Sequence, residues 1–504
     1  MKNKNSQGFI SLKKGFEARK KIFHNRASAF FPLYITKKND FFLVFFNYWL
    51  NKNNIKTDLI NLVLYIYNEE GDLVERFNSK INNYHNQFSI ATILGNKLKN
   101  KFIGTVSVEI LSLENLNFPF PALLGVYKSN NLFSSVHSAG RIKNVNEKHE
   151  IFYTKETNWT CKFEKNVTPF FHYFVGPTLP RKKYITVTLL THDKKTKKTK
   201  KISIEKLKLF GSKIFFIKEI FGKIKYNNND FISVKVEHNS IFPRLVVGNY
   251  HKNKSFFETT HSFPFIERKD YCPVISDKTF QSKLSAYRNK ELDLNLKVFP
   301  TNCAGNFKGE IFVKKFNQQR LLSDKPLINY NSKLLSKMNI FPLNNDDQFI
   351  SLKMRGNKIP SRFNASFVYK VKGSKSNYSV DVADGARSCI TPAKISHWGH
   401  GYVGDKYESL VMIINDNYQT SNNKTAKGKL NIYSPDYKTK NMINVTIQPD
   451  SLTIINISQL KNISKLKTKN HFFSWFLRLK EPGCEAFWVS YRKSDGAIFG
   501  DHSF

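Results

Sequence analysis

Residues 472–504 read FFSWFLRLKEPGCEAFWVSYRKSDGAIFGDHSF, and this stretch predicts the architecture of the whole chain. Apolar and aromatic runs on both sides of its Pro-Gly break predict two strands, and a third short strand follows the Ser-Asp-Gly turn. Related stretches begin at Phe102, Phe231 and Phe349, each with a strand, a proline break, a second strand and a polar turn. We interpret them as four diverged copies of one β-unit.

The four copies predict an all-β fold. Many short strands separated by turn residues are typical of a sandwich, so we expect four tandem immunoglobulin-like β-sandwich units with aromatic-rich junctions. The expected boundaries are a basic leader at 1–39, units at 40–141, 184–265, 291–389 and 407–504, a junction at 142–183, a linker at 266–290, and a Gly/His/Trp junction at 390–406.

Composition and charge limit the function classes. The 504 residues are 40% hydrophobic and 14% aromatic, which is enough to build sizeable cores and excludes a disordered chain. The net charge of +41 is spread along a chain that is also rich in Asn, Ile and Phe, as AT-rich codons produce. We therefore expect a polyanion partner such as nucleic acid only as a disfavoured alternative, and we interpret the lysine run at 194–201 as a loop tip.

The five cysteines include no Cys-x-x-Cys pair, which favours reduced thiols over a disulfide scaffold or zinc ribbon. The longest apolar runs are far shorter than a membrane span. The sequence therefore predicts a cytoplasmic protein without a membrane span, and we expect no cofactor.

The segment before the fourth unit holds the candidate ligand site. Gly399, Gly401 and Gly404 match the spacing G-x-G-x-x-G, but a strand follows where a dinucleotide site needs a helix, so we expect a glycine-rich turn between units. The side chains that we expect to bind a ligand there are His397, Trp398, His400 and Tyr402, with Asp384 and Arg387 from the end of the third unit.

Two alternatives stay open for this segment. Trp398 could instead plug into a neighbouring unit as an interface anchor. A metal on His397 and His400 is disfavoured, because the glycines argue against the helix that would place both rings on one face. We therefore assign no metal ligand and no catalytic residue.

A His-Ser dipeptide closes three of the four units, at His137, His261 and His502. The three rings would share a site only if the units packed as a pseudo-symmetric ring. We prefer a local hydrogen bond from each imidazole to a loop carbonyl. Four tyrosines that follow the proline breaks are expected to pack at corners and bond backbone carbonyls, namely Tyr127, Tyr250, Tyr369 and Tyr491.

The sequence contains no recognisable catalytic arrangement. Asp501-His502-Ser503 is not a triad, because consecutive residues of a strand point to opposite faces. We therefore expect a non-enzymatic binding or scaffold protein whose ligand is a glycan or another protein. The alternatives are an enzyme with a His-lined, metal-dependent site at a unit junction, and a polyanion-binding protein.

Overall fold

The structure is a computed structural model that describes most of the chain. The described residues are 23–52, 55, 60–81, 83–138, 140–143, 150–157, 159–190, 197–222, 233–264, 271–273, 280–284, 291–298, 307–317, 320–331, 339–342, 347–356, 358–360, 362–387, 395–415, 425–434, 440–449, 451–460, 471–480 and 484–503. Within these ranges, only the backbone is described for 197, 264, 271–284, 298, 307–365, 383–387 and 440.

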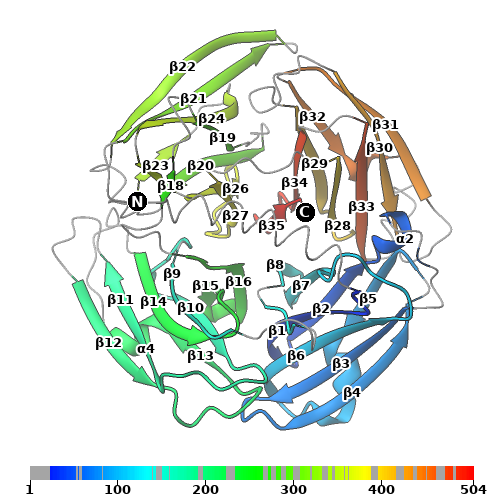
Figure 1. Cartoon of the computed structure of the whole chain (residues 1–504), viewed down its shortest axis with the longest axis vertical. Helices are drawn as coiled ribbons and strands as arrows, with labels where there is room; N and C mark the ends of the chain where they lie inside the picture. The colour runs from blue at the N-terminus through cyan, green and yellow to red at the C-terminus, as the bar shows by residue number, and fades with distance from the viewer. Residues whose placement is uncertain are drawn as a thin grey trace. The chain divides into compact units, whose positions relative to one another are not determined.

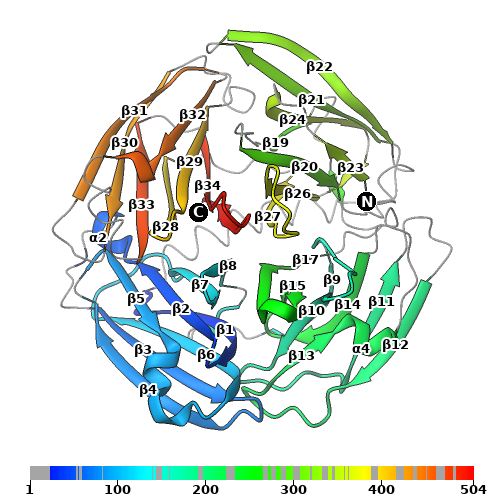
Figure 2. The same cartoon turned by 180° about the vertical axis from the view of Figure 1, so that it is seen from behind.

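Strands dominate the structure, at 63% against 7% helix, and this confirms the all-β prediction. The chain divides into two compact units, an N-terminal unit of residues 15–265 and a C-terminal unit that contains residues 266–504. Each unit holds two pairs of antiparallel sheets, which we number 1 to 4 along the chain (Figures 1 and 2).

Sheet pair 1 is one eight-stranded sheet that consists of two halves, β4-β3-β6-β1 and β5-β2-β7-β8. The halves join only where Thr36 of β1 pairs with Asn39 of β2. The elements are β1 (Arg26–Thr36), β2 (Asn39–Phe46), α2 (Trp49–Lys52), β3 (Ile60–Asn68), β4 (Leu73–Lys80), β5 (His85–Ser89), α3 (Ile90–Leu94), η2 (Gly95–Lys97), β6 (Lys101–Ser112), β7 (Ala122–Ser129) and β8 (Leu132–His137).

Sheet pair 2 contains the sheets β12-β11-β14-β9-β17 and β13-β10-β15-β16. Both sheets supply buried side chains to one core, for example Val187 and Val236 from the first and Phe171 and Val247 from the second. The elements are β9 (Phe152–Thr157), β10 (Val167–Phe174), β11 (Tyr184–Leu190), β12 (Lys197–Ser203), β13 (Ser212–Phe216), α4 (Ile217–Phe221), β14 (Ser233–Ser240), β15 (Val246–His251), η3 (Lys252–Lys254), β16 (Phe256–His261) and β17 (Phe263–Pro264).

Sheet pair 3 contains β22-β21-β24-β19 and β23-β20-β26-β27, beside a two-stranded sheet β18-β25. Its strands are β18 (Tyr271–Pro273), β19 (Phe280–Leu284), β20 (Leu292–Val298), β21 (Phe307–Asn317), β22 (Arg320–Asn331), β23 (Asn339–Pro342), β24 (Asp347–Gly356), β25 (Lys358–Pro360), β26 (Arg362–Val371) and β27 (Val380–Arg387).

Sheet pair 4 contains β31-β30-β33-β28 and β32-β29-β34-β35. Its elements are β28 (Ser396–Val403), β29 (Glu408–Asn415), β30 (Ala426–Tyr433), β31 (Lys440–Ile447), β32 (Ser451–Asn456), η6 (Ile457–Gln459), β33 (His471–Leu479), β34 (Cys484–Tyr491) and β35 (Ile498–His502).

The same strand order occurs in all four sheet pairs. With the eight principal strands of a pair counted in chain order, one sheet runs fourth-third-sixth-first and the other runs fifth-second-seventh-eighth. The stretches that the sequence matched to 472–504 are the sixth, seventh and eighth strands of each pair. Residues that occupy the same place in this order can therefore be compared between copies.

The first strand of each pair lies in a segment that the sequence predicted to be a leader, junction or linker. These strands are β1, β9, β19 and β28. The difference has a physical reason. Pro32 lies within β1, Gly399 and Gly401 lie within β28, and polar residues interrupt the apolar pattern of β9 and β19. The partner strands also lie far away in the chain. In the sheets, β1 pairs with β6 and β28 pairs with β33 along their whole lengths.

The seventh strand of each sheet pair carries one of the four tyrosines, and the hydrogen bonds of two of them are described by the structure. The hydroxyl of buried Tyr127 donates to the carbonyl of Pro32 at 2.7 Å, which confirms the predicted backbone bond. Tyr491 differs, because its hydroxyl donates to the carboxylates of Glu291 at 2.6 Å and Glu408 at 3.1 Å. Burial and these carboxylates raise the pKa of Tyr491.

Aromatic rings join sheet pairs 1 and 2 inside the N-terminal unit. Phe30 of β1 stacks against Phe174 of β10 and against Phe242, with ring centroids 5.2 and 5.1 Å apart. A Cβ atom on Gly140 or Gly176 would lie within 2.4–2.7 Å of this cluster, so both positions need glycine for the rings to pack. The two sheet pairs of this unit therefore share a dry, ordered contact.

Candidate functional site

Four of the predicted ligand residues lie on strand β28 of sheet pair 4. The segment forms a continuous strand against β33, with His397 opposite Leu477 and Tyr402 opposite Phe472, where the sequence predicted a glycine-rich turn. His397, His400 and Tyr402 are buried, at 2%, 1% and 3% exposure. Trp398 is half-buried, and its ring meets the ring of His400 edge to face at 5.8 Å.

Serine hydroxyls orient both histidines of β28. His397 Nδ1 lies 2.9 Å from Ser503 Oγ, and His400 Nδ1 lies 3.0 Å from Ser474 Oγ. Burial lowers the pKa of His400 to about 3, against an opposing charge from Asp501. His400 is therefore neutral at neutral pH and is a poor general base there.

The glycines of β28 make room for aromatic rings. A Cβ atom on Gly399 would lie 2.4 Å from Trp475 and 2.7 Å from Trp488, and a Cβ on Gly401 would lie 2.2 Å from Phe473. The G-x-G-x-x-G spacing therefore serves core packing, and no helix begins at it that could hold a pyrophosphate.

The other two predicted ligand residues, Asp384 and Arg387, occupy the eighth strand of sheet pair 3, β27. Their side chains lie outside the described part of the chain. The structure therefore places four of the six residues together on one strand and leaves the association of the other two with them as a prediction.

The three repeated histidines occupy one place in the strand order. His137, His261 and His502 are the last residues of β8, β16 and β35, each the eighth strand of its pair, and Arg387 ends the eighth strand of pair 3. The Nδ1 atom of His261 donates to the carbonyl of Ser262 at 2.9 Å, and that of His502 donates to the carbonyl of Ser503 at 2.9 Å. The predicted local bond to a carbonyl is confirmed for these two rings.

Two of these histidines belong to the N-terminal unit and meet there. The rings of His137 and His261 have centroids 4.3 Å apart and cross at 74°. Both are buried, at 8% and 3% exposure. The strands that carry them are held together by Thr259, whose amide donates to Ser134 Oγ at 2.8 Å and whose hydroxyl lies 2.5 Å from the same atom.

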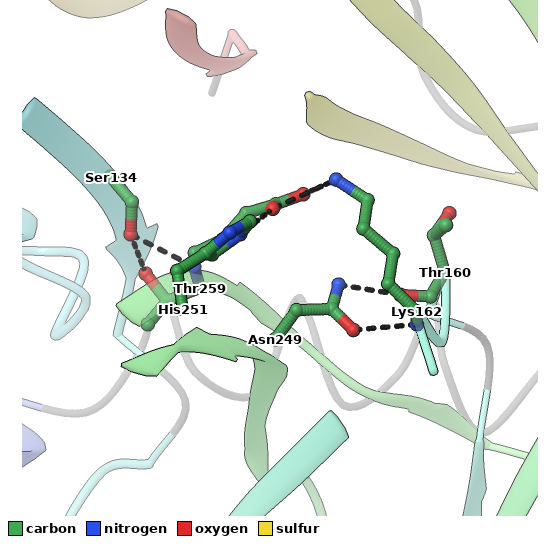
Figure 3. A network of polar contacts seen from close by, with 7 residues as sticks. Ser134, Thr160, Lys162, Asn249, His251 and Thr259 are labelled. Carbon is green, nitrogen blue, oxygen red and sulfur yellow. Dashed lines mark hydrogen bonds and ion pairs between the residues drawn. The ribbon is translucent and has the colours of Figure 1, made fainter. Parts of the chain in front are cut away.

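A buried ion-pair network joins Glu258 of β16 to His251 of β15 and to Lys162 (Figure 3). The ammonium of Lys162 contacts both carboxylate oxygens of Glu258 at 2.7 and 2.8 Å, and His251 Nε2 lies 2.8 Å from Glu258 Oε2. Burial alone would raise the pKa of Glu258, but Lys162 and His251 outweigh it and lower the pKa to about 2. Glu258 is therefore ionised at neutral pH and committed to these two partners.

Asn249 fixes the segment that carries the lysine. Its Oδ1 accepts from the backbone amide of Lys162 at 2.8 Å, and its Nδ2 donates to the carbonyl of Thr160 at 2.7 Å. Figure 3 shows both groups on the same side of the Asn249 amide, with the Lys162 side chain extending away from them. No sequence motif predicted this network.

The outward face of the sheet β12-β11-β14-β9 combines lysines with exposed tyrosines. Tyr153 of β9 is 51% exposed and Tyr184 of β11 is 36% exposed. The ammonium of Lys182 lies 4.7 Å from the centre of the Tyr153 ring and 5.7 Å from that of Tyr184, and Lys201 lies 5.1 Å from Tyr184. This surface, the Tyr/Lys face, presents aromatic rings and positive charge together.

Strand register places further lysines on the Tyr/Lys face. Lys201 of β12, Thr186 of β11, Glu237 of β14 and Lys155 of β9 form one row across the four strands. Glu237 accepts from Tyr153 at 2.5 Å and pairs with Lys235 at 2.7 Å. The lysine run 194–201 was predicted to be a loop tip, but its residues 197–201 belong to strand β12, and 194–196 lie outside the described residues.

No protein-family model matches the sequence, and a comparison with curated proteins found no match. Across the described ranges, no helix has the length and apolar character needed to cross a membrane.

Proposed function

We propose that this chain is a non-enzymatic binding or scaffold protein, built from four tandem immunoglobulin-like β-sandwich units, that binds an anionic glycan on its Tyr/Lys face. The observation that carries the ligand assignment is the pair of exposed rings, Tyr153 and Tyr184, with the Lys182 ammonium beside both. Sugar C–H patches pack on aromatic faces, and ammonium groups attract carboxylate or sulfate.

The repeated strand order supports the sandwich units. In sheet pair 2, a five-stranded and a four-stranded sheet enclose one core, and in sheet pair 1 Tyr127 bonds a backbone carbonyl as a corner tyrosine does.

The state of the β28 histidines supports a non-enzymatic role. His400 is buried and neutral, and each of the two rings is bound to a serine hydroxyl. A His-lined active site needs at least one ring whose proton can exchange with a substrate near neutral pH. The enzyme alternative therefore draws little support from this strand.

The polyanion alternative is favoured by the same lysines, so the test must separate the two ligands. We expect the full chain to bind heparin, to ignore neutral dextran of equal size, and to lose affinity as salt rises, because salt screens the lysines. Tyr184→Ala and the double variant Lys182→Ala/Lys201→Ala should each weaken heparin binding by about fivefold or more. The matched control is Lys213→Ala, an exposed lysine of the other sheet, on β13.

Two outcomes would overturn the glycan assignment. Unchanged heparin affinity in Tyr184→Ala, with an unchanged melting temperature, would remove the ring from the binding surface. Tighter binding of a single-stranded oligonucleotide than of heparin at equal charge would assign the face to nucleic acid, whose bases stack on tyrosine.

A further inference from the structure

The eighth strands of sheet pairs 1 and 2 bring two histidines together inside the N-terminal unit. His137 ends β8 and His261 ends β16, and the Ser134–Thr259 bonds hold the two strands in place. The ligand nitrogens of the two rings lie within 4.8 Å of each other. This pair is distinct from the Tyr/Lys face, which lies on the other sheet of pair 2.

The tautomer of His261 suits it to bind a cation. Because its Nδ1 donates to the Ser262 carbonyl, the neutral ring carries its lone pair on Nε2. A carbonyl that fixes the far nitrogen of a ring is the usual support for a metal-binding histidine, since it orients the ring and raises its basicity.

The spacing of the two rings is close to what one shared ion needs. Their centroids lie 4.3 Å apart, and both rings are buried. In a tetrahedral site with Zn–N bonds of about 2.0–2.1 Å, the two nitrogens lie about 3.3 Å apart, which small ring rotations reach.

We propose that His137 and His261 bind one divalent transition-metal ion of the class that prefers imidazole, with Zn²⁺, Co²⁺ and Ni²⁺ as members. The two rings supply two ligands, and water or a further donor fills the remaining positions. The ordinary alternative is an edge-to-face contact between two neutral rings that stabilises the strands and binds nothing.

The test titrates metal into the full chain after chelation and dialysis. Co²⁺ serves as the probe, because imidazole ligation gives it a visible d–d spectrum, and competition with Zn²⁺ gives the affinity of the native-like ion. We expect one Co²⁺ per chain in the wild type. His137→Gln and His261→Gln should each weaken binding by at least tenfold, whereas His471→Gln, a half-buried histidine at the start of β33, should leave it unchanged.

Thermal stability provides the second readout. The metal-free variants should melt within a few degrees of metal-free wild type, since glutamine keeps most of the volume of the ring. Metal should raise the melting temperature of the wild type alone, because binding to the folded state stabilises it. No saturable Co²⁺ binding by folded wild type, or equal binding by the folded His261→Gln variant, would overturn the proposal.

Discussion

Glu258 shows how one side chain sets the acid stability of its surroundings. Its folded pKa of about 2 lies below the ordinary value of 4.5, so the unfolded chain takes up a proton first as the pH falls. The stabilisation is complete above about pH 4.5 and is lost as the pH falls from there towards 2.

We therefore expect Glu258→Gln to destabilise the N-terminal unit at pH 7 by about 3–5 kcal/mol, because the buried Lys162 ammonium loses its counter-charge. The variant should also lose less stability than wild type between about pH 4.5 and 3. Urea unfolding at pH 7, 4 and 3 measures both effects. If the unfolding free energies of the two proteins fell equally with pH, protonation of the Glu258 carboxylate would not be the cause of the acid destabilisation.

Strand β28 requires glycine at position 399, because the neighbouring tryptophan rings leave no space for a side chain. We expect Gly399→Ala to lower the unfolding free energy by about 1–3 kcal/mol, since the new methyl group would press on Trp475 and Trp488 in a filled core. Chemical denaturation measures the cost. Ser396→Ala, at a half-buried position of the same strand, is the control, and equal stability of the two variants would contradict this account.

The elements that the sequence predicted best are those with local signals. The sixth, seventh and eighth strands are apolar and aromatic runs separated by a proline break and a polar turn, so their pattern is visible within about 40 residues. The first strands were missed because their partners are distant, as Ser396 pairs with Arg478, and because the two glycines of β28, with Gly404 directly after it, resemble a turn. Side-chain pattern also could not tell that His397 and His400 point into a core.

The candidate sites also differ in how far the sequence could predict them. The equivalence of His137, His261 and His502 could be predicted, because a His-Ser dipeptide recurs at matching places. The Lys162–Glu258 pair was not, since 96 residues separate its members and neither lies in a motif. The Tyr/Lys face was hidden for a related reason, because it depends on register across four strands.

At the scale of the whole molecule, the aromatic contact between sheet pairs 1 and 2 predicts one cooperative transition for residues 15–265. Trp49 and Trp159, one in each pair, are fully buried and report on them separately. In protein labelled with 5-fluorotryptophan, the two ¹⁹F resonances, assigned by Trp→Phe variants, should lose native intensity at the same urea concentration. Phe242→Ala should shift both midpoints down together, by about 3–5 kcal/mol in free energy. Separate midpoints in the wild type would show that the two pairs unfold independently.

The repeated strand order also creates a risk of misfolding during synthesis of the chain. The first strand of each copy pairs with the sixth, which is synthesised much later, as Arg26 pairs with Leu111. Each copy therefore has a high contact order and is expected to fold slowly. Until the sixth strand is made, the equivalent strand of an earlier copy is a competing partner, and such pairing between copies is how tandem repeats misassemble. The four copies differ in length and in turn residues, and Arg387 ends the eighth strand of pair 3 where the other three have a histidine. Divergence between the copies therefore disfavours pairing between strands of different copies. Selection for correct folding alone would maintain this divergence.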